Sequence, residues 1–381
     1  MGEPGHTAIG TWSGGRYMHF GEALDDERLA ALLRPDGVRT LITADTYGAG
    51  ETDSLLGRAL AGVPRQDYVL VGSIGHDFYE GEREGAKGFP RFTDSRLRGP
   101  DGYRDYVRMA VERSLERCGV DSFDLLLLHN PDRTGFESAE VWDALRELRD
   151  EGLAGSLGVA PGPANGFTLD LIGCFGRFGG LIDWAMLILN PLEPWPGELA
   201  LRAAERHDVK VITRVVDYGG LFHDDVLPGH VFPPGDHRGF RPAGWVEAGR
   251  ARLERMRPLA ERHGMTMLQL ACQWNLAHEA VRCVAPTLIQ EAGAGAKPIE
   301  QKRAELAAVS RRVALSAEEV ADLREIGDNR GSMLLKGATP DHEGEERPDR
   351  WALQPEHEEL ARRWGIDPER DLRRGASPAG V

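Results

Sequence analysis

The sequence predicts a (β/α)₈ barrel with long loops at the carboxyl ends of its strands and a short helical C-terminal extension. Short apolar runs alternate with longer amphipathic stretches over most of the 381 residues. Strict alternation of strands and helices favours a parallel sheet, and eight such units favour a closed barrel over an open doubly wound sheet. The leucines of DLLLLH, at Asp124–His129, are typical of a strand buried on both faces.

In chain order, the apolar runs predict strands near Ala8–Trp12 and at Thr40–Ala44, Tyr68–Ser73, Asp124–His129, Ser156–Ala160, Asp183–Leu189, Lys210–Val215 and Val281–Ala285. Helices are expected between them. The stretch before Gly119 keeps an apolar stripe at helical spacing, and so does the stretch before Gly152, with the glycines as stop signals. The other expected helices are Thr52–Leu60, Gly197–His207, Val246–His263 and Met267–Ala277.

Two inserts interrupt this rhythm, Gly75–Gly102 and Tyr218–Gly244. Both follow strands, so we expect them at the C-terminal mouth of the barrel, where substrate loops belong. Residues 1–328 are predicted to form one barrel. Residues 329–381 are expected to form an extension whose segment WALQPEHEELARRWGIDP contains an amphipathic helix that docks on the barrel.

Composition narrows the possible partners and location. With 46 Lys and Arg against 61 Asp and Glu, the formal net charge is −15, which disfavours nucleic acid and anionic membranes as partners. No apolar run approaches the roughly 20 residues that span a bilayer, and the N-terminus lacks a signal-peptide pattern. Four widely spaced cysteines indicate buried thiols in a reducing compartment rather than disulfides or a zinc site. We therefore expect a cytoplasmic protein that acts on a small molecule; its oligomeric state is left open.

Several linked segments resemble the aldo-keto reductases, roughly over residues 7–327. TADTYGAGETDSLLGRAL (Thr43–Leu60) is similar to the stretch that holds the family's catalytic tyrosine, and FDLLLLHNPD (Phe123–Asp132) to the strand that ends in its active-site histidine. VWDALRELRDEGLAGSLGV (Val141–Val159) and the segment Ile299–Gly327 resemble later parts of the fold. The resemblance implies a (β/α)₈ barrel that reduces carbonyl compounds with NADPH.

The resemblance places the catalytic tyrosine at Tyr47 and the histidine at His129. In the family, an acid and a lysine lower the pKa of this tyrosine. At the corresponding positions this sequence has Ile42 and Ser73. Loss of both together is coordinated, since losing one alone would leave an unpaired buried charge. Asp45 would substitute in part only if its side chain pointed inward.

The nicotinamide contacts of the family are also replaced. They fall on Ala160, Pro161, Met186 and Leu189, whose side chains offer no comparable hydrogen bonds. The remaining cofactor candidates are Asn190, the loop residues Gly219, Gly220 and Leu221 for a pyrophosphate, and Lys297, or Lys302, for a 2′-phosphate. Glu305 would repel that phosphate, so NADP(H) is expected only if the cofactor pose has changed.

Other polar residues are predicted near the mouth. Arg214 ends a strand, where a cation can bind a substrate carboxylate or phosphate, although structural pairing with a carboxylate remains an alternative. Histidines and carboxylates gather in the two inserts and directly before the second one, and solvated loop charge explains them better than a metal does, so no metal site is predicted. They are His76, Asp77, Asp217, His223, Asp224 and Asp225. Trp12, Phe78, Trp184 and Trp195 either line a pocket or belong to the core.

Three functions remain open. The first is an enzyme that uses Tyr47, His129 and Arg214 for acid–base chemistry on a polar, sugar-like carbonyl or hydroxylated compound, by non-redox elimination or epimerisation. The second is an NADPH-dependent aldehyde or ketone reductase with the same tyrosine and histidine. The third is a non-catalytic ligand-binding subunit, because a fold does not fix a function.

Overall fold

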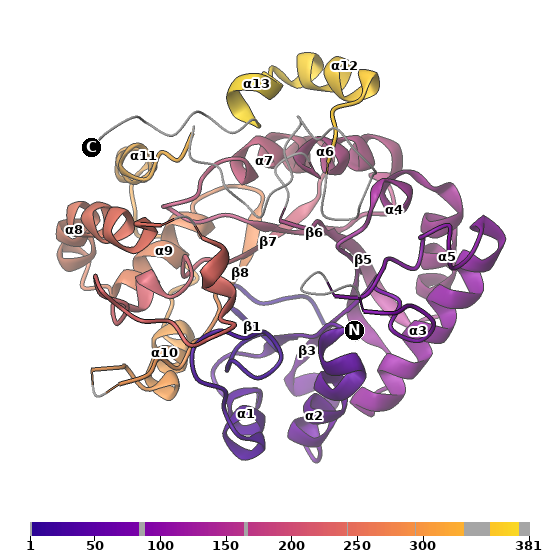
Figure 1. Ribbon diagram of the computed structural model, residues 1–381, viewed down its shortest axis with the longest axis horizontal. Coiled ribbons are helices and arrows are strands. Elements are labelled where there is room, and N and C mark those ends of the chain that lie inside the picture. The colour runs from indigo at the N-terminus through magenta and orange to yellow at the C-terminus, as the bar shows by residue number, and fades with distance from the viewer. Residues whose placement is uncertain are drawn as a thin grey trace.

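The chain forms a barrel of eight parallel strands. The computed structural model describes residues 2–83, 88–163, 167–241, 243–293, 295–330 and 351–372. The strands pair in chain order, and Thr7 bridges in parallel to Val284, which brings the first and last strands together (Figure 1). The strands are β1 Ala8–Gly10, β2 Thr40–Ile42, β3 Val69–Ile74, β4 Phe123–His129, β5 Ala154–Ala160, β6 Trp184–Ile188, β7 Lys210–Arg214 and β8 Val281–Ala285. The predicted (β/α)₈ barrel is therefore confirmed.

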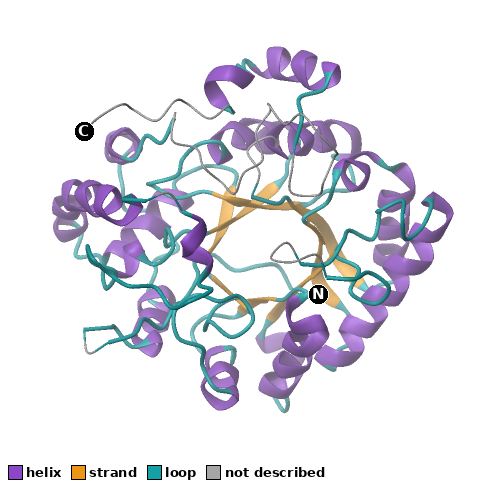
Figure 2. Cartoon of the chain, in the orientation of Figure 1, coloured by secondary structure: helices purple, strands orange, loops and turns teal. Residues whose placement is uncertain are grey.

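Helices surround the strands as an outer ring (Figure 2). Those of the described residues are α1 Asp26–Leu32, α2 Glu51–Leu60, α3 Tyr103–Cys118, α4 Arg133–Glu137, α5 Ala139–Asp150, α6 Phe167–Phe178, α7 Gly197–Arg206, α8 Trp245–Arg262, α9 Met267–Leu276, α10 Ile299–Ala307, α11 Ala317–Ile326, α12 Pro355–Trp364 and α13 Pro368–Asp371. The sequence reasoning missed four of them, α1, α4, α6 and α13. Helix α6 escaped because FTLDLIGCFGRF is apolar on most sides and carries two glycines, which are poor helix formers.

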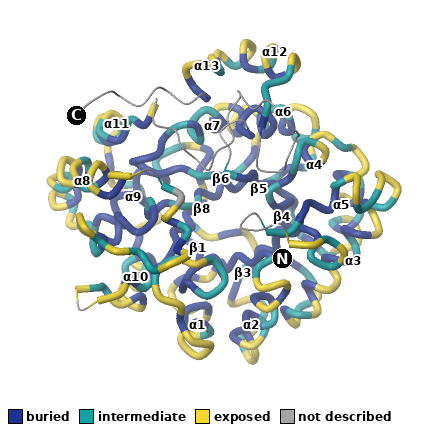
Figure 3. Tube along the Cα trace, in the orientation of Figure 1, coloured by how far each residue is buried: buried dark blue, intermediate teal, exposed yellow. Residues whose placement is uncertain are grey.

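Two clusters of buried apolar residues hold the barrel together. The strands are buried along most of their length, whereas the outer helices alternate between buried and exposed residues (Figure 3). The larger cluster lies between the strands and the helices. The smaller cluster fills the inside of the barrel, as is usual for this architecture, and Tyr47 and Met18 pack against it. Its members are Ala8, Trp12, Ile42, Val71, Leu125, Leu127, Ala160, Trp184, Met186, Ile212, Cys283 and Ala285.

The C-terminal extension packs against the outside of the barrel. Helix α12 contacts α6, and Trp351 and His357 are buried at this contact. Residues 331–350 and 373–381 of the predicted extension lie outside the described residues. The division of the chain at residue 328 stays a prediction. Among the described residues, no helix combines the length and the apolar character that crossing a membrane requires.

Candidate functional site

Three predicted site residues lie at the carboxyl ends of their strands. His129 is the last residue of β4 and Arg214 the last of β7, while Tyr47 begins a short 3₁₀ turn, Tyr47–Gly50, shortly after β2. The rings of Tyr47 and His129 meet edge to face, with centroids 5.9 Å apart. The structure thus brings the tyrosine and the histidine together at the barrel mouth.

The surroundings keep both rings neutral. Burial raises the pKa of Tyr47 to about 12, although the positive charge of Arg214 works in the opposite direction. Burial lowers the pKa of His129 to about 3, and the charges of Arg91 and Arg214 lower it further. Near neutral pH, the tyrosine therefore keeps its proton and the histidine carries no charge.

The polar groups of these residues are largely unused within the described part of the chain. The Tyr47 hydroxyl and the His129 ring make no hydrogen bond there, and His129 Nδ1 is buried. The Arg214 guanidinium makes one, from Nη2 to the carbonyl oxygen of Pro161 at 3.1 Å. Polar groups that are buried without partners are costly, so this arrangement indicates a ligand site.

The replacement of the family's acid and lysine by Ile42 and Ser73 stays a prediction, and the structure places both residues on the inside of the barrel. Ile42 belongs to the apolar interior of the barrel, and Ser73 lies two residues after the interior residue Val71, on the inward side of β3. Asp45 does not replace the acid. Its carboxylate is fully buried on the helix side, where it interacts electrostatically with Asp53 of α2 and Arg117 of α3.

The first insert contributes residues that the sequence reasoning did not connect with His129. A Cβ atom at Gly75 would collide with the His129 carbonyl oxygen, so only glycine allows the insert to begin this close. The His76 ring then lies 5.3 Å from the His129 ring, and Arg91 donates to His76 Nδ1 at 2.8 Å. Arg91 also donates to the carbonyl oxygen of Asn130. No motif in the sequence signals Arg91.

Comparison with known proteins now decides the family. The model of the aldo/keto reductase family matches residues 7–328. The chain belongs to the aldo/keto reductase family. A D-threo-aldose 1-dehydrogenase from Pseudomonas is 30% identical over 175 residues, which are 41% of this chain and 53% of that protein. The chain thus spans about half the length of this relative.

Further relatives carry the same family name or fold. Versiconal hemiacetal acetate reductase of Aspergillus parasiticus is 23% identical over 282 residues, 64% of this chain and 72% of that protein. The structure of glycerol dehydrogenase from Gluconobacter oxydans matches with a TM-score of 0.64 and 24% identity, over 89% of this chain and 95% of that one. An aldo/keto reductase from Klebsiella pneumoniae, in complex with NADP and acetate, matches with a TM-score of 0.55 and 20% identity, over 84% and 90%.

Aldo/keto reductases normally use NADP(H), but the residues expected to hold its nicotinamide do not fit. Ala160 and Met186 face the apolar interior, and Leu189 packs in the larger cluster. Asn190 is fully buried and its amide is engaged within the protein. It donates to Glu193 at 3.1 Å and to the carbonyl oxygen of Val215 at 3.0 Å, and it accepts two backbone N–H groups.

The residues expected at the phosphate positions are engaged in part within the protein. Gly220 N donates to Asp217 at 2.8 Å, Gly219 O accepts from Arg238, and the Leu221 side chain is buried. Lys297 Nζ lies 2.8 Å from Glu305, and the buried Lys302 lies 2.6 Å from Asp225. The predicted cofactor contacts at Asn190, Gly219, Gly220, Leu221 and Lys297 remain predictions, and the side chains of Asn190 and Lys297 and the N–H group of Gly220 are engaged internally.

The acidic and histidine residues of the inserts also serve the fold. Asp77 pairs with Arg98, Asp224 pairs with Arg250 and Arg257, and His223 Nε2 lies 2.8 Å from the Thr287 carbonyl oxygen. Phe78 stacks on Tyr79, while Trp12 and Trp184 belong to the interior core and Trp195 lies under Arg324.

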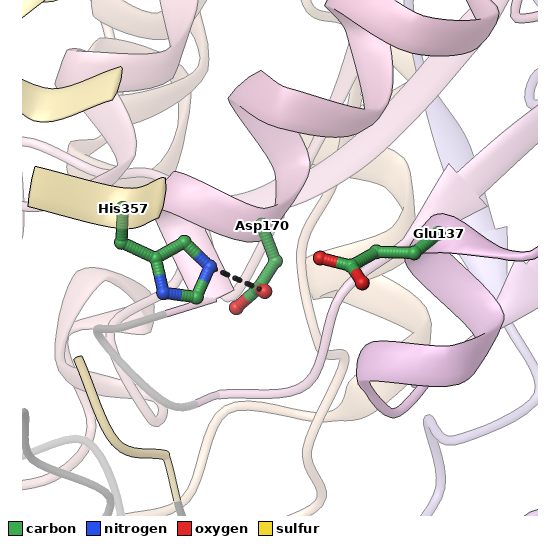
Figure 4. A group of neighbouring side chains, drawn as sticks. All are labelled: Glu137, Asp170 and His357. Atoms are coloured by element: carbon green, nitrogen blue, oxygen red, sulfur yellow. Dashed lines mark hydrogen bonds and ion pairs between the residues drawn. The ribbon is translucent and has the colours of Figure 1, made fainter. Parts of the chain in front are cut away.

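One group of described residues has the spacing of metal ligands, and it lies outside the barrel. The ligand atoms of Glu137, Asp170 and His357 lie within 4.8 Å of one another (Figure 4). His357 Nε2 is 3.0 Å from Asp170, and Trp351 Nε1 donates to the other Asp170 oxygen. Gln354 N donates to His357 Nδ1 at 3.2 Å. These bonds occupy the ring nitrogens and both Asp170 oxygens, so the group joins the extension to α6.

Proposed function

We propose that this aldo/keto reductase family member is an enzyme that transfers protons at the carbonyl group of a small, polar, sugar-like compound. One observation carries the proposal. Tyr47 and His129 share the mouth of the barrel with unused polar groups, while the acid–lysine pair is replaced by Ile42 and Ser73.

Each residue has a role in this reaction. His129 is uncharged, so its ring accepts a proton as the C–H bond beside the carbonyl breaks. The electron pair moves to the carbonyl oxygen, which takes the Tyr47 proton to give an enol, and Arg214 stabilises the negative charge that develops there. Return of a proton to the other face gives an epimer. Loss of a neighbouring hydroxyl group as water gives an unsaturated carbonyl compound.

A second candidate is nicotinamide-dependent oxidation or reduction of a sugar-like substrate. Family membership and the dehydrogenase and reductase names of the relatives favour it. Tyr47 would still exchange the proton of the carbonyl oxygen. The internal bonds at the expected cofactor positions argue against it, and so NADP(H) is no part of the first proposal.

Deuterium exchange separates the two candidates. Hydroxy-aldehydes and hydroxy-ketones are incubated with the protein in D₂O, and loss of the C–H signal beside the carbonyl is followed by NMR without nucleotide. We expect exchange that falls roughly 10²–10⁴-fold in Tyr47→Phe and His129→Gln, as for other acid–base residues. Tyr17→Phe, a half-buried tyrosine on a neighbouring loop, should retain it.

A parallel titration with NADPH, followed by fluorescence, tests the alternative. Stoichiometric binding with hydride consumed during turnover would establish the second candidate and remove the first. Exchange that is equally fast in both variants would show that Tyr47 and His129 are not catalytic.

A further inference from the structure

Arg214 is a cation without an anionic partner in the described part of the chain. It forms no ion pair with any described residue, and its single hydrogen bond goes to the neutral carbonyl oxygen of Pro161. Arg214 is partly buried, and burial lowers the pKa of its guanidinium. Holding an unpaired charge in such a place costs free energy that a well-placed anion would recover.

The neighbouring carboxylates are committed elsewhere. Glu193, whose charge reaches Arg214, pairs with Arg241 at 3.1 Å. Asp217 accepts the backbone N–H groups of Gly220 and Thr287 at 2.8 and 2.7 Å. The protein therefore supplies no counterion for Arg214 among its described side chains.

The other two groups at the mouth are neutral. Tyr47 offers an O–H donor, and His129 adds a ring with one donor and one acceptor nitrogen. A ligand that satisfies Arg214 must therefore bring the negative charge itself. The guanidinium is planar and matches the two oxygens of a carboxylate, and one positive charge balances one carboxylate better than it balances a phosphate dianion.

We propose that Arg214 binds the carboxylate of the substrate, so that the substrate is a small hydroxy- or keto-acid of the sugar-acid type rather than a neutral sugar. This inference rests on the proposed function for the position of the reacting carbonyl, which would lie within a few bonds of the carboxylate. Burial and the charge of Arg91 lower the pKa of His129 more than Arg214 does, but a bound carboxylate would offset the Arg214 contribution and raise the pKa of His129 in part.

Binding of oxamate tests the proposal without any turnover. Oxamate has a carboxylate next to a carbonyl group, and oxamide is its uncharged counterpart. Calorimetric titration should show saturable binding of oxamate that weakens roughly ten-fold or more in Arg214→Gln, because truncating one partner of a buried charge pair is costly. Arg214→Lys should retain part of the binding, and oxamide should bind weakly to all forms.

Arg282→Gln is the matched control, since Arg282 is an exposed arginine on β8. It should bind oxamate like the unaltered protein. If Arg214→Gln does not fold, the pKa of His129 is measured by NMR in the unaltered protein instead. Binding of oxamate should raise this pKa.

Equal oxamate binding in Arg214→Gln, or an unchanged His129 pKa at saturation, would overturn the proposal. The proposal would also be overturned if inorganic phosphate bound more tightly than oxamate. The same holds if NADP⁺ binding depended on Arg214 while oxamate binding did not. The proposed function fails separately, when deuterium exchange is absent although oxamate binding depends on Arg214.

Discussion

Tyr47 and His129 meet edge to face with ring centroids 5.9 Å apart, and burial shifts their pKa values in opposite directions, to about 12 and about 3. Both shifts favour the uncharged form. The pair therefore stays neutral over most of the pH range in which the protein is expected to work. Among the described residues, the charges that act on His129 are those of Arg91 and Arg214.

The low pKa of His129 predicts a pH dependence of stability. An unfolded histidine binds a proton below about pH 6.5, whereas the native ring binds one only near pH 3. As the pH falls through this window the unfolded chain gains a proton that the native protein lacks, so the free energy of unfolding decreases. His129→Gln should remove this contribution, measured as a smaller loss of stability between pH 7 and pH 4.5 in urea unfolding. An unchanged pH dependence would contradict the prediction.

Asp45 predicts a stabilising substitution. Neither of its buried oxygens has a hydrogen-bond partner among the described residues, and burial beside Asp53 raises its pKa well above the ordinary value. The unfolded carboxyl ionises first as the pH rises, so stability falls above about pH 4 until the native group also ionises. Asp45→Asn should raise the free energy of unfolding at pH 7 by roughly 1–3 kcal/mol.

Asp124 provides the contrasting control for Asp45. It is equally buried, but it pairs with Arg65 at 2.7 Å and accepts the Leu70 N–H at 2.8 Å. Asp124→Asn should therefore destabilise the protein. If both substitutions shift the urea midpoint in the same direction, the prediction that Asp45 lacks a stabilising partner is wrong.

Docking of the extension depends on Asp170. Its carboxylate holds Trp351 and His357 at once, so Asp170→Ala should leave two buried donors unsatisfied and release α12 from α6. Limited proteolysis should then cut within residues 351–372 while the barrel stays intact. Glu359→Ala, on the exposed side of α12, should leave the cleavage pattern unchanged.

The Lys297–Glu305 pair predicts weak binding of a 2′-phosphate. Releasing Lys297 in Glu305→Gln should increase the affinity for 2′,5′-ADP by at least roughly two- to five-fold, because even an exposed ion pair contributes up to about 1 kcal/mol. Both side chains of this pair are mostly shielded from solvent. Glu300→Gln is the control. Glu300 lies on α10, like Glu305, but it pairs with Arg28 of α1 and not with Lys297. Tight binding by the unaltered protein with no response to Glu305→Gln would refute the prediction.

The barrel and the meeting of Tyr47 with His129 were accessible from sequence because parallel strands end at a common mouth. Once β2 and β4 were located, residues just past their ends had to lie near each other. The direction of Asp45 was not accessible, because it depends on how the chain turns after β2. Arg91 reaches His76 from a long insert, and the internal bonds of Asn190 depend on a tight turn. Neither leaves a periodic signal in the sequence.

The tryptophans inside the barrel limit the routes by which a compound can reach Tyr47 and His129. Trp12 and Trp184 help to fill the interior, which is a packed core and not a channel. A compound that reaches Tyr47 and His129 therefore cannot pass through the interior to the opposite end of the barrel. Substrate and product must enter and leave at the same end, the one that carries the loops after the strands.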